Sequence, residues 1–149
     1  FEAKLNINLK SAGKLYLGAQ AVCSEINHSS EDSEYRRYTR YNHKTQVNAG
    51  QSVNIWSGEG MIFEGVDVTA AGYIHAKSED TLENRTVHNI FQEESRKESK
   101  GGFLKGKKTE STQTTNDTVV QNIFKAGNAF SFLAFAGKVF ICGLLNDCF

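Results

Sequence analysis

A short repeat constrains the fold of this chain more than any other feature, because an Ala-Gly pair recurs and is followed by alternating apolar and polar residues. Two clear copies begin at Gly50 and Gly72, about 22 residues apart. Between them, Val53 to Ile55 and Val66 to Val68 have an apolar residue at every second position, which favours strands over helices. Several short strands within one period are typical of a β-solenoid coil. The four copies are Ala12-Gly13, Ala49-Gly50, Ala71-Gly72 and Ala126-Gly127.

Two of the intervals between copies are much longer than one period, which indicates insertions. The surplus falls at about residues 25–45 and 78–118, where charged, Ser and Thr residues replace the apolar alternation. We therefore expect an all-β chain in which residues 1–149 form a single solenoid fragment interrupted twice.

The second insertion has the order of a long hairpin. Extended-type segments at Thr86 to Glu94 and Thr109 to Val120 flank a turn at Gly101-Gly102. The two arms of such a hairpin hydrogen-bond each other, and their polar composition indicates solvent on both faces.

The alternation also predicts a narrow core. Because each coil needs neighbours to cover its apolar edge, inward side chains of successive coils should stack. The predicted core residues are Leu15, Leu17, Val53, Ile55, Val66, Val68, Ile74, Phe130, Phe132, Val139 and Ile141.

Charge and hydropathy exclude several classes of partner. Lys+Arg and Asp+Glu are equal at 17 each, so the chain has no general attraction to nucleic acid, and we expect no nucleic-acid partner. The longest apolar stretch, Ala129 to Leu145, is interrupted by Lys138 and falls short of the roughly 20 residues of a membrane helix. We therefore expect no transmembrane segment.

Cysteine usage and the first residues say little about the compartment. Three cysteines are too few for a disulfide framework. Cys142 and Cys148 are close enough in sequence to pair, or they are two independent thiols, and the sequence leaves both options open. The start at Phe1 has no charged-then-apolar leader, and we expect a piece of a longer protein.

No motif predicts catalysis, a cofactor or a metal. The segment Gly101 to Lys107 matches G-x-x-x-x-G-K, but Lys108 follows where a phosphate loop needs Ser or Thr. We interpret it as a cationic hairpin tip, with Lys105, Lys107 and Lys108 as candidate contacts. The four histidines lack the paired spacing of metal sites. We expect no catalytic, cofactor-binding or metal-binding residue.

An enzyme of another class is the alternative. Carbohydrate-degrading enzymes with a β-helix fold use carboxylates clustered on one face, and here such a cluster would need Asp67 with Glu59 and Glu64. Fold alone does not assign that activity.

The first insertion contains the strongest candidate for recognition. Aromatic and Arg side chains interleave there, and both residue types are enriched in binding hot spots. In the alternative, these residues serve a twisted hairpin in which the arginines pair with Glu31, Asp32 and Glu34. The candidate partner-binding residues are Tyr35, Arg36, Arg37, Tyr38, Arg40 and Tyr41.

Taken together, the Ala-Gly coils and the second insertion resemble the haemagglutinin-type repeats of filamentous haemagglutinin-like exoproteins, which Gram-negative bacteria secrete through two-partner systems. Nearly the whole chain is covered by about four coil-like units, and Glu94 to Thr109 is similar to the Lys-rich "Gly-Phe-Leu" segment that interrupts such repeats. The chain departs from the family in its bulky stretch Phe130 to Phe140 and in its three cysteines.

The resemblance implies both a fold and a role. The fold would be a right-handed parallel β-helix with two protruding hairpin-like insertions. The role would be a secreted or cell-surface bacterial adhesin segment, or the stalk of a contact-dependent inhibition exoprotein, without enzymatic activity. The implied partners are a receptor or glycan on a host or neighbouring cell, and an outer-membrane secretion partner for the full-length protein.

Overall fold

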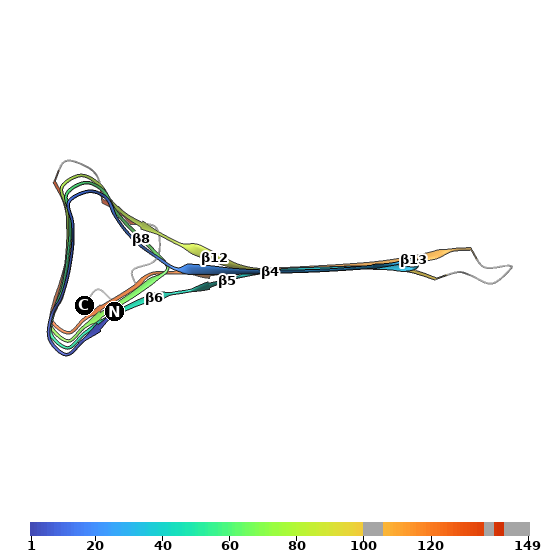
Figure 1. The fold of residues 1–149 in the computed structure, drawn as a ribbon, viewed down its shortest axis with the longest axis horizontal. Coiled ribbons are helices and arrows are strands. Elements are labelled where there is room, and N and C mark those ends of the chain that lie inside the picture. The colour runs from blue at the N-terminus through green and yellow to red at the C-terminus, as the bar shows by residue number, and fades with distance from the viewer. Residues whose placement is uncertain (100–105, 136–138, 142–149) are drawn as a thin grey trace. The chain divides into compact units, whose positions relative to one another are not determined.

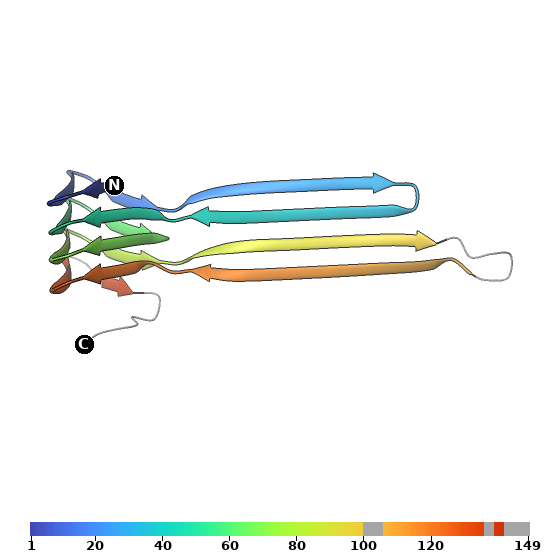
Figure 2. The ribbon, with the colours of Figure 1, turned by 90° about the horizontal axis from the view of Figure 1, so that it is seen from below.

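The computed structural model describes residues 1–99, 106–135 and 139–141, and every regular element in these ranges is a β-strand (Figures 1 and 2). The all-β prediction is therefore confirmed. No helix in the described ranges is long and apolar enough to cross a membrane. Three predictions fall outside this description. They are the burial of the Val139 and Ile141 side chains, the turn at Gly101-Gly102 and the pairing of Cys142 with Cys148.

The chain forms two compact units. One, here called the coil unit, comprises Phe1–Gln20, His43–Val87 and Val120–Phe149. The other, here called the hairpin unit, comprises Ala21–Asn42 and His88–Val119.

The coil unit consists of three four-stranded sheets, and the strand pairs in each are parallel. Following the chain, one strand enters sheet A, the next enters sheet B and the third enters sheet C, and this order occurs four times. One passage through A, B and C is one coil. Sheet A contains β1 (Glu2–Ala3), β6 (Thr45–Ala49), β9 (Val66–Ala70) and β14 (Ile123–Ala126); sheet B contains β2 (Ile7–Ser11), β7 (Val53–Ser57), β10 (Tyr73–Ser78) and β15 (Ala129–Ala134); sheet C contains β3 (Leu15–Gly18), β8 (Met61–Glu64), β11 (Leu82–Arg85) and β16 (Val139–Ile141).

The sheet register corrects the alignment of the Ala-Gly copies. Ala49, Ala70 and Ala126 are register partners in sheet A, so the Ala71-Gly72 pair lies one position later than the neighbouring copies. The first pair, Ala12-Gly13, lies between β2 and β3 rather than between sheets A and B. It is therefore not an equivalent copy, because the corresponding step of the first coil is made by residues 4–6.

Inward side chains from all three sheets form one apolar cluster. Val53, Ile55, Val66, Val68 and Ile74 are buried as predicted, whereas Leu15, Leu17, Phe130 and Phe132 are partly buried against that cluster. The sequence prediction missed further fully buried residues, and the large apolar ones among them are Val47, Met61, Phe63 and Leu82.

Aromatic contacts join the three sheets of the coil unit. The ring of Phe63 in sheet C lies edge-on to Phe124 of sheet A, with centroids 5.2 Å apart. The ring of Phe124 is also edge-on to Phe132 of sheet B, at 4.8 Å. These edge-to-face contacts favour one aligned arrangement of the three strands.

Both insertions occur where the chain passes from sheet C to sheet A. The first lies between β3 and β6, and the second lies between β11 and β14. The coil between them makes the same step with Gly65 alone, at a φ of +68°. This left-handed conformation, which glycine adopts without a Cβ penalty, lets the chain turn within one residue.

The hairpin unit is a single four-stranded sheet rather than two separate hairpins. Its strand order is β13-β12-β5-β4, and neighbouring strands run in opposite directions (Figure 2). The two insertions pair through β5 and β12, which are antiparallel partners. Its strands are β4 (Gln20–Ser30), β5 (Ser33–His43), β12 (Val87–Ser99) and β13 (Lys108–Val120).

The second insertion also begins later than the sequence indicates. Residues 78–87, expected to be part of it, belong to the coil unit. The reason is that Ser78 ends β10 and Leu82 fills the core from β11, both with 0% exposure.

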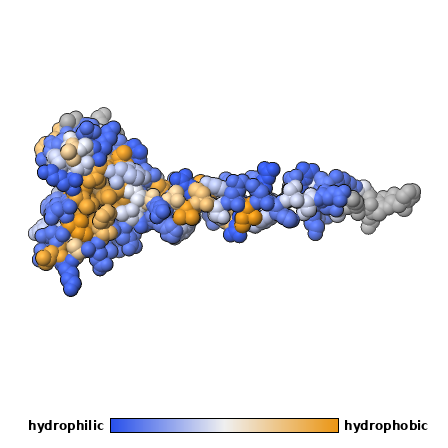
Figure 3. Space-filling view, in the orientation of Figure 1, coloured by the Kyte–Doolittle hydropathy of each residue, from blue (hydrophilic) through white to orange (hydrophobic). Residues whose placement is uncertain are grey.

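On the face shown in Figure 3, hydrophobic residues gather over the coil unit, while the hairpin unit is mainly hydrophilic.

Replacing the central aromatic residue tests the shared core. Phe63→Ala should lower the free energy of unfolding by about 3–5 kcal/mol, because it leaves a cavity beside Phe124 and Phe132. Chemical denaturation followed by circular dichroism measures the change. The matched control Leu133→Ala, at a 51% exposed position, should stay within about 0.5 kcal/mol of the parent. Equal effects of the two substitutions would contradict this core.

Replacing the corner glycine tests the one-residue step. Gly65→Ala should destabilise the protein by about 1 kcal/mol or more, since its φ is positive and its Cβ would lie 2.7 Å from that of Ala19. Gly106→Ala is the control, because nothing lies within 4 Å of the Cβ it would add. Thermal unfolding of both variants checks the difference, and a harmless Gly65→Ala would show that the step does not need glycine.

Candidate functional site

The Tyr- and Arg-rich segment lies on β5, an inner strand of the hairpin unit. Because side chains alternate along a strand, its six candidate residues divide between the two faces of the sheet. Tyr35, Arg37 and Tyr41 lie on one face, and Arg36, Tyr38 and Arg40 lie on the other. The predicted binding residues therefore form two half-sets rather than one surface.

The first half-set is completed by β12. The Tyr35 hydroxyl donates a 2.6 Å hydrogen bond to Glu93, and this bond raises the pKa of the phenol. The Arg37 guanidinium lies 5.2 Å from the ring centroid of Phe91, in cation–π contact. We call Tyr35, Arg37, Tyr41, Phe91 and Glu93 the Tyr35 face.

The second half-set is more polar. The Tyr38 hydroxyl lies 3.7 Å from the sulfur of Cys23, and this hydrogen bond raises the pKa of the phenol. Further along the same side, Gln113 of β13 donates a 3.1 Å bond to Glu94. An open hollow of about 310 Å³ lies beside Arg36 and Glu94 and is lined by polar side chains. Its charged lining suits polar contacts rather than an apolar ligand.

Opposite charges face each other across β5 and β12. Arg36 is the register partner of Glu94, Arg37 of Glu93, and Glu34 of Arg96. Pairs at such positions stabilise one register, and like charges there would destabilise it. Arg36 and Arg37 thus face carboxylates of the other insertion, whereas Arg40 faces Ile90.

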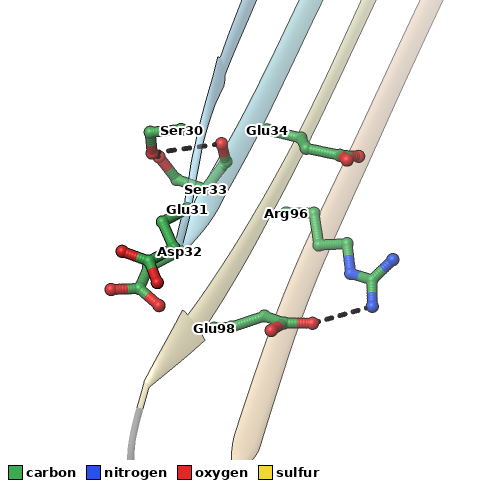
Figure 4. A pocket seen from close by; sticks show the side chains of 7 residues that line it. All are labelled: Ser30, Glu31, Asp32, Ser33, Glu34, Arg96 and Glu98. Atoms are coloured by element: carbon green, nitrogen blue, oxygen red, sulfur yellow. Dashed lines mark hydrogen bonds and ion pairs between the residues drawn. The ribbon is translucent and has the colours of Figure 1, made fainter.

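The turn between β4 and β5 carries Glu31 and Asp32, which the sequence alternative paired with the arginines, while Glu34 lies on β5 (Figure 4). Glu31 and Asp32 line an open hollow of about 120 Å³, together with Glu98. Arg96 donates a 2.9 Å hydrogen bond to Glu98 within β12. The backbone N–H of Glu98 donates a 2.8 Å hydrogen bond to the carbonyl oxygen of Asp32, which joins this turn to β12.

Two lysines of the predicted cationic tip, Lys107 and Lys108, have partners in the hairpin unit. Lys107 forms an ion pair with Glu98, and this hydrogen bond lowers the pKa of the Glu98 carboxyl. Lys108 lies 2.6 Å from Glu110 on the same strand. Lys105 falls outside the described residues. The described part of this tip is thus charge-paired.

The outer face of sheet B holds an aromatic group that the sequence prediction missed. Lys10 lies 4.7 Å from the ring centroid of Trp56, and the indole N–H of Trp56 donates a 3.2 Å bond to Glu79. Hydrogen bonds from Lys77 and Trp56 lower the pKa of Glu79. The sequence does contain a signal for this group. Trp56 directly follows the inward residue Ile55, so the alternation of a strand points Trp56 outward.

The carboxylates of the enzyme alternative lie on different elements: Asp67 and Glu64 are on different sheets, and Glu59 is in the turn between β7 and β8. Asp67, on β9 of sheet A, forms a 2.7 Å ion pair with Lys44. Glu64 is on β8 of sheet C, close to Tyr16. Burial raises the pKa of the Tyr16 hydroxyl, and the negative charge of Glu64 raises it further. Within the described ranges, no three His, Cys, Asp or Glu side chains are grouped to hold a metal ion.

Comparison with family models, with curated proteins and with solved structures finds no match for this chain.

Charge reversal tests the pairing of the two insertions. Both E93R/E94R and R36E/R37E place like charges opposite each other, so amide hydrogen exchange in β5 and β12 should accelerate. Combining all four substitutions restores opposite charges and should restore protection. Exchange measured by mass spectrometry or NMR follows the effect. The control K4E/K14E reverses two exposed charges of the coil unit and should leave these amides unchanged. Failure of the fourfold variant to recover would contradict a charge-specified register.

Proposed function

We propose that this chain is a segment of a secreted or surface-exposed bacterial adhesin of the filamentous haemagglutinin-like type, in which the coil unit is a spacer and the hairpin unit makes contacts. The observation that carries the proposal is the fourfold passage through three parallel sheets with coil-to-coil register. Such an array is rigid and repetitive, which suits a stalk.

We infer that the coil unit is a right-handed parallel β-helix. After each strand, the chain passes through the other two sheets and then adds the next strand beside the first, parallel to it. Crossovers between parallel strands of one sheet are right-handed in about 98% of cases.

The Tyr35 face is the part of the hairpin unit best suited to contact a partner. Tyr41 is 55% exposed, and Phe91 and Arg37 lie beside the ordered Tyr35–Glu93 pair. Aromatic rings held by neighbouring contacts lose little conformational freedom on binding. The partner would be a receptor or glycan on a host or neighbouring cell, and the full-length protein would use an outer-membrane secretion partner.

Binding to intact cells tests the proposal. The labelled chain should bind epithelial or bacterial cells, and Y35S/Y41S should weaken that binding by about tenfold or more, because it removes the aromatic contacts of one face. Y38S tests the opposite face and should have a smaller effect. The matched control is Tyr73→Ser, at a 45% exposed position of the coil unit, which should bind like the parent.

The outcomes separate the alternatives. Equal binding by the parent and Y35S/Y41S would exclude the Tyr35 face, and loss in Y38S alone would move recognition to the opposite face. Absence of binding by the parent would favour an inert stalk. Release of new reducing or unsaturated ends from polysaccharides would instead support the enzyme alternative.

A further inference from the structure

Strand β13 lies at one edge of the hairpin-unit sheet, where β12 is its only neighbour in the described strand order. Every residue from Lys108 to Val119 is exposed. The outer side of such a strand presents a row of backbone N–H and C=O groups without a strand partner, and these groups can pair with another strand.

The central part of β13 lacks the features that usually protect an edge. It contains no proline, and no charge occurs between Glu110 and Asp117. The central residues are Thr, Ser, Gln and Asn, and Thr is favoured in strands. Uncharged, β-prone segments of about six residues without proline are the ones that pair most readily with their own copies.

The geometry points to β13 as a self-association surface that pairs antiparallel with β13 of a second copy across a two-fold axis. An axis perpendicular to the sheet preserves its faces, so each residue meets a residue of the same face in the partner. In registers centred on Thr112, Gln113 or Thr114, the central rows bring together only uncharged residues. In the same registers Glu110 meets Thr114, Asn116 or Thr118 and never its own copy.

The opposite edge of the sheet does not have this self-complementarity. Strand β4 is also exposed throughout, but Glu25 is its middle residue. In the symmetric antiparallel register that pairs β4 along its whole length, Glu25 lies directly opposite its own copy, and like charges at such positions are destabilising. Thus β13 is the edge that favours a second copy.

Charge variants that act in all three registers test this pairing. In T112E/T114E, at least one Glu meets a Glu of the partner whichever register forms, and T112K/T114K does the same with Lys. Sedimentation velocity over a range of protein concentrations should show a dimer for the parent. Each variant alone should dissociate at least about tenfold more readily. An equal mixture of the two variants should form a heterodimer.

Two controls isolate the edge. Reducing conditions prevent disulfides, such as one at the exposed Cys23, from imitating a dimer. N27E/S29E places the same two charges on β4 and should dimerise like the parent, because that edge stays outside the interface. A monomeric parent at every concentration, or a dimer that withstands both charge variants, would overturn the proposal. So would variants that remain monomeric when mixed although circular dichroism shows that both are folded.

Discussion

Parallel strand pairing between successive coils is the interaction on which the rest of the coil unit depends. In sheet B, Val53 is the partner of Ile74, and Ile74 is the partner of Phe130. This register aligns the inward positions of all coils, so a few apolar residues per coil contribute to one shared core. A coil that lost its pairing would also lose the neighbours that bury its side chains.

The hairpin unit depends on a different balance. None of its described residues belongs to the buried apolar cluster. Backbone hydrogen bonds and facing charges, such as Glu34 with Arg96, must specify its strand order. A slip by one residue would move every side chain of β5 to the other face, so these charge pairs stabilise the order of the sheet and also decide which face holds Tyr35.

The sequence predicts local pattern better than long-range pairing. Val53, Ile55 and Ile74 were recognised as core residues because they alternate with polar neighbours on short strands. Phe63 was missed because Met61-Ile62-Phe63 is a continuous apolar run, and such a run does not reveal which residues point inward. The pairing of β5 with β12 was missed because complementary charges identify a partner only after the chain has brought it within reach. The misplaced Ala12-Gly13 copy shows the same limit, since similar turns occur at more than one corner of a coil.

Gly65 has a consequence for the relative widths of the sheets. Four coils supply one strand each to sheets A, B and C, whereas two insertions supply two strands each to the hairpin-unit sheet, so all four sheets contain four strands. An insertion in every coil would double the strand count of that sheet alone. Between the two insertions, the single-residue step at Gly65 provides a coil without an insertion. A longer array of this kind would therefore need insertions in only half of its coils to extend all four sheets at the same rate.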